Sequence, residues 1–388
     1  MFRPGNRLTL LENGASYFPA LLEALDGARQ EIHLESYIFE PDDTGRAVLD
    51  ALIRAARRDV RVHMLLDGFG CRDFPPEIAE KLAAAGVQLM FFRPEPSFLL
   101  RFRRHRLRRM HRKIVLIDAR IAFVGGINVI DDRTGQPLRG RQPAHRYDYA
   151  VRMEGPVLVD VWQAVRRLWW LVRWSRIGHR PGLGRDPQPD AHAIGTQPAA
   201  FLVRDNLRNR RAIESAYLDA IRAAREEILI ANAYFLPGRR FRQALIQAAR
   251  RGVRVVLLMQ GATDHRLYLL AAQALYGHFL ENGVEIHEYR ASYLHAKVAT
   301  VDEDWSTVGS SNIDPFSLVM AREGNVFVRD CRFTDELRRS LHQAIRERAR
   351  PLHARLWRRQ PWYRRAASWA VYGLVRLAAG LVGYAGLN

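Results

Sequence analysis

Cysteine and lysine are both scarce in this chain of 388 residues. The two cysteines, Cys71 and Cys331, lie one in each half and lack the short spacings of a metal site. A disulfide framework and a cysteine-bound zinc ion therefore find no support, and we expect both thiols to be reduced and buried. Acidic residues are outnumbered, which leaves a net charge of +19. Such a surplus favours an anionic partner: nucleic acid, anionic lipid or a phosphorylated substrate.

A secretory signal is also lacking, because no long apolar stretch follows a basic region near Met1. We therefore expect the body of the protein to remain cytoplasmic. The marks of disorder are absent too, since 48% of the residues are hydrophobic and 26% are charged. A folded chain of this length suggests two domains of roughly 150 to 200 residues each.

The sequence contains an internal duplication. The segment ARQEIHLESYIFEP (28–41) recurs as AREEILIANAYFLP (224–237), and AARRDVRVHMLL (55–66) recurs as AARRGVRVVLLM (248–259). A period this long indicates two whole lobes. We predict an N-terminal lobe over 1–175, a Gly/Pro-rich linker over 176–199, a C-terminal lobe over 200–345 and a tail over 346–388.

Each copy alternates runs of helical period with short β-branched and aromatic runs. This alternation predicts an α/β fold in which each lobe has a mixed or largely parallel sheet. The expected fold class is therefore two tandem α/β lobes.

A second repeated pattern carries polar residues. HRKIVLIDARIAFVGGIN begins at His111, and HAKVATVDEDWSTVGSSN begins at His295. The shared positions are His111, Lys113, Asp118, Gly125 and Asn128 in the first copy and His295, Lys297, Asp302, Gly309 and Asn312 in the second. Identical spacing at matching places in a duplicated chain indicates one site built from both lobes.

The choice of lysine within these motifs is informative. Of the 60 Lys and Arg residues, only Lys81, Lys113 and Lys297 are lysines, and two of the three follow a motif histidine by two residues. The guanidinium of arginine is a wide planar fork, whereas the ammonium is a compact point charge. The site therefore needs the smaller group against a single oxygen.

The residue types predict phosphodiester chemistry. Residues i and i+2 of a strand share a face, so each histidine and its lysine point the same way. A neutral imidazole attacks phosphorus while a protonated one donates to the leaving oxygen. Lys113, Lys297, Asn128 and Asn312 would surround the non-bridging oxygens, with neither a metal nor an organic cofactor. The glycines before each asparagine would let the backbone approach a bound anion.

These motifs resemble those of the phospholipase D superfamily, and the chain is most similar to bacterial cardiolipin synthases of the B type. The resemblance covers about residues 5 to 345 and implies one active site at the interface of the lobes. By this resemblance His111 is the nucleophile and His295 the acid, and Asp148 and Glu323 orient the imidazoles. It also makes Asp118 and Asp302 motif members, although strand geometry places them past the strand end, where we expect them to hold the lobe interface or a turn.

The implied function is cardiolipin synthesis by transfer of a phosphatidyl group from phosphatidylglycerol to a second phospholipid. The sequence leaves the acceptor open between phosphatidylglycerol, phosphatidylethanolamine, another alcohol and water. The alternatives are a phospholipase D-type hydrolase or a metal-independent nuclease and, against both intact motifs, a non-catalytic membrane or nucleic-acid binding module. With a lipid substrate we expect no nucleic-acid partner.

Three segments suit a membrane surface. The basic run 101–113 follows Phe98, Leu99 and Leu100, which suits anionic headgroups with apolar side chains among them. The tryptophan-rich stretch 168–174 fits a core helix and an interfacial anchor equally well. The apolar tail 366–387 carries Arg376, so we expect a helix that lies in the interface. The predicted location is the inner membrane, peripheral on its cytoplasmic side.

The remaining histidines attract no function. We expect His33, His63, His105 and His287 to be surface residues or hydrogen-bonded core residues.

Overall fold

The computed structural model describes residues 1–94, 108–132, 145–177, 187–205, 209–261, 266–314 and 321–380. The first half contains β1 (Arg3–Glu12), α1 (Asn13–Asp26), β2 (Glu31–Ser36), α2 (Asp43–Arg57), β3 (Arg61–Asp67), α3 (Pro76–Ala84), β4 (Gln88–Phe92), β5 (Ile114–Ile117), β6 (Ile121–Gly125), β7 (Tyr149–Glu154) and α4 (Leu158–Ile177). The second half contains β8 (Gln197–Arg204), α5 (Ala212–Ala223), β9 (Glu227–Asn232), α6 (Arg239–Arg250), β10 (Arg254–Gln260), α7 (Arg266–Glu281), β11 (Glu285–Tyr289), β12 (Lys297–Val301), β13 (Trp305–Gly309), β14 (Glu323–Arg329), α8 (Cys331–Arg348), β15 (Ala349–Leu352), α9 (Ala354–Arg358) and α10 (Trp362–Ala379).

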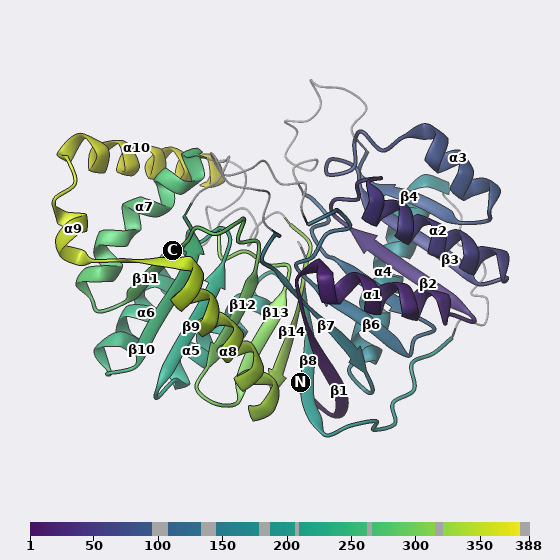
Figure 1. Ribbon diagram of the computed structural model, residues 1–388, viewed down its shortest axis with the longest axis horizontal. Coiled ribbons are helices and arrows are strands. Elements are labelled where there is room, and N and C mark those ends of the chain that lie inside the picture. The colour runs from purple at the N-terminus through teal and green to yellow at the C-terminus, as the bar shows by residue number, and fades with distance from the viewer. Residues whose placement is uncertain are drawn as a thin grey trace.

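The two lobes share one continuous sheet in the described residues. Its order is β15-β11-β10-β9-β12-β13-β14-β8-β1-β7-β6-β5-β2-β3-β4. β1 and β8 meet antiparallel at its centre (Figure 1). Outward from this pair the strands follow the same order in both lobes, and β15 is an additional edge strand of the second lobe. In each lobe three strands are parallel and the rest are antiparallel. The predicted α/β class with a mixed sheet in each lobe is confirmed, and the lobes join edge to edge.

Local sequence explains the elements that carry the site. Every residue of β2 is buried, as expected for a strand covered on both faces, which is why its sequence does not alternate strictly. α2 begins where the Asp42 carboxylate accepts a hydrogen bond from the Gly45 N–H at 2.9 Å. Its apolar stripe, including Val48, Leu49 and Leu52, then packs on the sheet.

One apolar core belongs to both lobes. Val124 and Leu158 of the first lobe lie in the same buried cluster as Val308 and Leu337 of the second, and each is at most 1% exposed. Burial of one such side chain contributes about 1.5 to 3 kcal/mol. The lobes are therefore held together by the same force that stabilises each one, which fixes the relative positions of the two sequence motifs.

The segment boundaries differ from the predicted linker and tail. α4 extends to Ile177 and β8 starts at Gln197, so regular structure enters both ends of the predicted 176–199 linker. Its residues 178–186 lie outside the described residues. β15 pairs antiparallel with β11, with Ile286 opposite Leu352, so the tail begins by completing the sheet of the second lobe.

The end of the chain lies on the second lobe. α10 packs against α7, with Ser368 and Tyr372 buried, and Figure 1 shows the two helices side by side. Its other side exposes Trp362, Leu374 and Leu377 to 80%, 64% and 61%. Among the helices of the described ranges, none combines the length and apolar character needed to cross a bilayer. Residues 381–388 of the predicted tail lie outside the description.

Two expectations about single residues were wrong or incomplete. Cys71 is buried as expected, but Cys331 is exposed because it begins α8 at the surface. Trp169 is a core residue with 4% exposure, whereas Trp174, on the opposite side of α4, is 57% exposed. The tryptophan-rich segment is therefore a core helix with one exposed edge.

Candidate active site

Each motif histidine lies just before a strand, and the residue ahead of it is held by the end of a strand two places away in the sheet. Asp67 ends β3, and its carboxylate accepts a hydrogen bond from the N–H of Met110 at 2.7 Å. Gln260 ends β10, and its side-chain oxygen accepts from the N–H of Leu294. The sequence comparison missed both residues, because an acid in one copy and an amide in the other do not look like a repeated motif.

The histidines are next fixed by the main chain of the opposite lobe. The N–H of His111 donates to the carbonyl of Arg322 at 2.9 Å, and the N–H of His295 donates to the carbonyl of Tyr147 at 2.8 Å. Arg322 and Tyr147 are the residues directly before Glu323 and Asp148. Each main-chain bridge therefore delivers an acidic side chain to a histidine of the other lobe.

The histidine and acid pairs cross between the lobes. Nδ1 of His111 lies 3.1 Å from Glu323 Oε2 and 3.2 Å from the carbonyl oxygen of Ser310. Nδ1 of His295 lies 2.6 Å from Asp148 Oδ2. In each neutral ring the proton is therefore on Nδ1, which leaves the lone pair of Nε2 for chemistry. The residues expected to orient the rings are in place, each in the lobe opposite its histidine.

The two lysines complete this group. Nζ of Lys113 donates to the carbonyl of His111 at 2.9 Å, and Nζ of Lys297 donates to that of His295. Burial first, and then the charge of Lys297, lower the pKa of Lys113 to about 7. Burial lowers the pKa of Lys297 to about 8. Two buried ammonium groups that repel each other form a ready site for an anion.

Strand geometry was predicted only in part. β5 starts at Ile114, so His111 and Lys113 lie in an extended segment ahead of the strand, whereas Lys297 is the first residue of β12. The extended segment before β5 is tied to the second lobe by a bridge between Met110 and Arg322.

The imidazoles are kept neutral in the free protein. Burial lowers the pKa of His111, partly offset by the nearby Glu323 carboxylate. Burial, followed by the charges of Lys297 and Lys113, lowers the pKa of His295 well below its usual value. Burial also raises the pKa of Asp148 to about 6. An anion bound between the lysines would oppose their charge and let one histidine gain a proton.

The motif asparagines lie after the strands that follow each histidine and lysine pair. Asn128 and Asn312 follow β6 and β13 and are 4% and 5% exposed. The Asn128 side-chain oxygen accepts from the N–H of Ile38 at 3.2 Å, so its NH₂ group is the donor available to an anion. This placement is compatible with the predicted phosphate-binding role.

The motif glycines make room for side chains. A Cβ on Gly126 would lie 2.3 Å from Asp148 Oδ1, and one on Gly309 would lie 2.2 Å from the side chain of Asn325. Gly126 thus leaves room for the acid that holds His295, and Gly309 leaves room for Asn325. The second copy has Ser310 where the first has Gly126, and its hydroxyl donates to Glu323.

The motif aspartates do not belong to the catalytic set. Asp118 follows β5 at the end away from His111, and its carboxylate accepts three backbone N–H groups from residues 29–31 at 2.8 Å. Asp302 accepts those of residues 225–227 in the same way. Both have a positive φ, of 52° and 49°. They hold a turn, as geometry predicted, and they do not hold the lobe interface.

Tyr37 joins the site without a signal in the repeat. Its ring contacts that of His111 edge to face at 4.7 Å between centroids, and Nζ of Lys113 lies 5.2 Å from its centre. The matching residue in the second copy is Ala233. Tyr37 therefore makes the surroundings of His111 unlike those of His295.

The basic run 101–113 is described only in part. Residues 101–107 of the basic run lie outside the described residues, and Arg109 stacks over Phe69 at 4.7 Å.

In the described part of the chain, one group with metal-binding side chains is present, formed by Glu31, His33 and His63 away from the paired motifs.

Comparisons with known proteins agree with this arrangement. A family model described as "Cardiolipin synthase, PLD-like domain" matches residues 21–163 and 217–345. Cardiolipin synthase B of Escherichia coli strain K12 is 39% identical over 99% of this chain and 91% of its own length. Cardiolipin synthase 1 of Staphylococcus epidermidis is 30% identical over 92% and 71%.

Two solved structures share the fold. The phosphatidylserine synthase of Haemophilus influenzae has a TM-score of 0.69 at 15% identity, covering 97% of this chain and 95% of that one. The polyphosphate kinase of Porphyromonas gingivalis has a TM-score of 0.60 at 16% identity, covering 97% and 53%. At these identities the likeness concerns the fold alone.

Proposed function

The chain belongs to the family of cardiolipin synthases with phospholipase D-like domains, and from this premise we propose that it transfers phosphatidyl groups through an intermediate on His111. It is thus a phosphatidyltransferase of phospholipid biosynthesis. The observation that supports the proposal most is the crossed pairing of His111 with Glu323 and of His295 with Asp148. This arrangement gives two imidazoles with free Nε2 atoms in one site.

In the first half-reaction His111 is the nucleophile. Its Nε2 forms a bond to the phosphorus of phosphatidylglycerol while the bond from phosphorus to the headgroup glycerol oxygen breaks. His295, protonated at Nε2, gives its proton to that oxygen, and glycerol leaves. His111 suits attack because its Nδ1–H faces both Glu323 and the Ser310 carbonyl, which fixes the ring and its tautomer.

In the second half-reaction His295 is the base. Its Nε2, now neutral, takes the proton from the hydroxyl of a second phosphatidylglycerol. The hydroxyl oxygen bonds to phosphorus as the bond to His111 breaks, which releases cardiolipin and restores both rings. The same group serves as acid and then as base, as microscopic reversibility requires.

The anion explains how His295 becomes an acid. Burial, and then the lysine charges, hold the pKa of His295 low in the free protein, so it enters the cycle neutral. A phosphodiester between Lys113 and Lys297 offsets their charge, and a proton taken up with the substrate is then available for the leaving glycerol. Asn128 and Asn312 donate to the same phosphoryl oxygens in the transition state.

The direct test is incubation of the purified protein with phosphatidylglycerol vesicles, followed by mass analysis of the lipids and of glycerol. We expect cardiolipin and one glycerol per cardiolipin. Phosphatidic acid in place of cardiolipin would show hydrolysis and contradict the transfer. Adding phosphatidylethanolamine, whose headgroup carries an amine and no hydroxyl, tests whether it can replace phosphatidylglycerol as the phosphatidyl donor, with ethanolamine as the released alcohol.

We further propose that α10 places the enzyme on the cytoplasmic face of the inner membrane. Its outer side combines exposed Trp362, Leu374 and Leu377 with the cations Arg364 and Arg365 near the start of the helix. Apolar side chains beside arginines suit an anionic lipid surface. Trp369 lies toward α7, where it borders a cavity with Gly277 and Glu281.

This proposal is tested by sedimentation with phosphatidylglycerol vesicles. Replacing Trp362, Leu374 and Leu377 by serine should release much of the protein, while activity in detergent persists because these side chains lie on the outer side of the helix. The matched control changes Leu171 and Trp174, which are 45% and 57% exposed on α4. Unchanged sedimentation of the α10 variant would contradict the proposal, and release of the control variant instead would assign binding to α4.

A further inference from the structure

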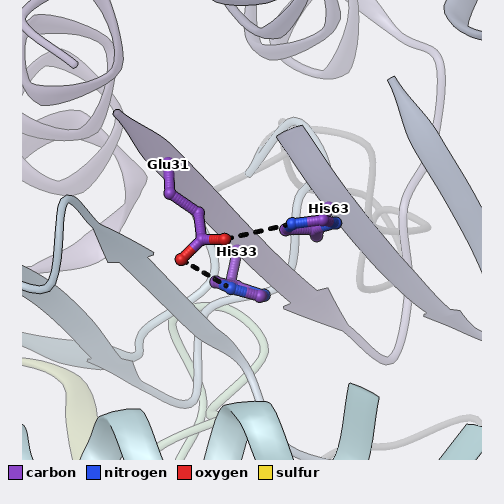
Figure 2. Close-up of side chains that lie close together, drawn as sticks. All are labelled: Glu31, His33 and His63. Carbon is purple, nitrogen blue, oxygen red and sulfur yellow. Dashed lines mark hydrogen bonds and ion pairs between the residues drawn. The ribbon is translucent and has the colours of Figure 1, made fainter. Parts of the chain in front are cut away.

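A buried cluster of three ionisable side chains lies apart from the catalytic group. Glu31 and His33 project from β2 and His63 from the neighbouring parallel strand β3, and Figure 2 shows the carboxylate facing both rings. The three residues are 4%, 4% and 8% exposed. The proposed phosphatidyl transfer uses none of them.

Their geometry suits a metal ion. Glu31 Oε1 lies 3.2 Å from Nε2 of His63, and Oε2 lies 3.3 Å from Nε2 of His33. One ligand atom from each residue lies within 4.8 Å of the others. Zinc binds imidazole nitrogen and carboxylate oxygen at about 2.0 to 2.2 Å, so tetrahedral ligands stand about 3.3 Å apart. Each carboxylate oxygen of Glu31 stands at about that distance from one of the two imidazole nitrogens.

The residues around Glu31, His33 and His63 favour binding of a metal ion. Nε2 of His33 is buried, and its contact with the Glu31 carboxylate at 3.3 Å lacks the alignment of a good hydrogen bond. The ring of Trp169 lies 4.6 Å from that of His63 and 6.2 Å from that of His33, so it covers the site. Arg61 lies 3.6 Å from Glu31 but is 40% exposed, and can turn to solvent when a cation binds.

The second lobe shows that the fold does not require this cluster. The positions that match His33 and His63 are Leu229 and Val256, both fully buried and apolar. The match to Glu31 is Glu227, which pairs instead with Arg254 and His342. At these two positions the strand pair of the second lobe carries apolar side chains, whereas that of the first lobe carries two imidazoles.

We propose that the first lobe binds one divalent transition-metal ion, of the zinc class, through Nε2 of His33, Nε2 of His63 and the Glu31 carboxylate. Two nitrogens and one oxygen suit zinc and leave its fourth position to a water molecule. The ion braces β2 against β3. The N–H of Glu31 donates to Asp118 at 2.8 Å, so the same strand end is held by the metal and by the motif aspartate.

The test uses the full-length protein, which is first dialysed against a chelator, then incubated with Zn²⁺ and desalted. We expect the protein to retain about one equivalent of Zn²⁺, measured by atomic emission. It should also unfold at a higher temperature with Zn²⁺ than without. Co²⁺ in its place should give the visible absorption of a four-coordinate nitrogen and oxygen site. His33→Leu and His63→Val copy the second lobe, and each should weaken zinc affinity by more than about 100-fold.

The matched control is His342→Leu, which removes a histidine from the carboxylate that corresponds to Glu31. It should retain the metal like the unchanged protein, with circular dichroism verifying the fold of every variant. If His33→Leu does not fold, Glu31→Gln serves in its place. The proposal is overturned if the unchanged protein retains no metal, or if the His33 and His63 variants keep the same equivalent. Neither result depends on the proposed transferase activity.

Discussion

In both repeats, the side chain at the end of one strand holds the residue before a histidine, and the opposite lobe supplies an acid to the ring. The two copies differ in how tightly that ring is held. His111 faces Glu323 and the Ser310 carbonyl, and its side chain is 15% exposed. His295 faces only Asp148 among these acceptors and is 22% exposed.

The residues that contact Glu323 and Asp148 also differ between the two copies. Ser310 donates to Glu323, whereas the matching Gly126 only makes room for Asp148. Tyr37 packs on His111 and has alanine as its counterpart. On the proposed assignment, the more tightly held imidazole attacks, and the more accessible one passes a proton to departing and arriving alcohols. Because the motifs are alike, the difference between the two rings lies in their partners.

Removal of either imidazole should have the largest effect. We expect His111→Ala and His295→Ala each to lower turnover on phosphatidylglycerol by roughly 10⁴ or more, since neither half-reaction proceeds without its partner. Turnover and thermal unfolding are measured together, and the unfolding midpoint should change little. An acid-labile phosphatidyl adduct found on His295 instead of His111 would reverse the comparison.

Replacing the acids by amides tests the crossed pairing. Glu323→Gln and Asp148→Asn keep the size of the side chain but lose the preference for Nδ1–H, and a wrong tautomer costs about 10⁴ in a comparable triad. We expect Glu323→Gln to slow adduct formation from any phosphatidyl donor, and Asp148→Asn to slow it only where the leaving alcohol needs a proton. Rapid quench with phosphatidylglycerol and with a phosphatidyl ester of nitrophenol separates the two effects. If Asp148→Asn slows the reaction of the nitrophenyl ester as much as Glu323→Gln does, the assignment of each acid to its histidine is wrong.

The two lysines should matter equally, because each faces the shared anion. Lys113→Arg and Lys297→Arg keep the charge, yet a broad guanidinium cannot replace a buried ammonium without displacing its neighbours. We expect losses of about 10² to 10³ in turnover, or ~2.7 to 4 kcal/mol. Lys81→Arg on α3 is the control, since Lys81 lies at the surface. Near-normal turnover in both variants would show that charge alone suffices.

The pH dependence should give the smallest effect. Lys113 and Lys297 have a pKa of about 7 and about 8 in the free protein, so the cationic site is complete at low pH and is lost as pH rises through those values. Bound phosphodiester favours the charged forms. The alkaline limb of kcat/KM, which reports free enzyme, should therefore lie at lower pH than that of kcat. Coincident limbs would contradict this account of the lysines.

The sequence alone predicted the features that repeat. The duplication gave the α/β lobes, and matched spacing gave His111, Lys113, His295 and Lys297. It did not predict Asp67 and Gln260, whose side chains hold the residue before each motif histidine, because they differ in type between the copies. Nor did it predict that each acid serves the other lobe, since that follows from the meeting of the strands in space.

The metal-binding group escaped prediction for a related reason. His33 and His63 are 30 residues apart by the numbering and have apolar counterparts in the second copy, so each looked like an ordinary histidine. Parallel pairing of β2 with β3 places them directly opposite each other. Register between distant strands is set by packing of the whole lobe, which single residues do not report.

The central claim is that His111 attacks and His295 moves the proton, and a substrate with a good leaving group separates these roles most directly. A phosphatidyl ester of nitrophenol needs no acid for departure, so the first half-reaction should survive without His295. Rapid mixing of this ester with His295→Ala should release about one equivalent of nitrophenolate in a burst, while His111→Ala releases none. A burst from His111→Ala, or silence from both variants, would contradict the account.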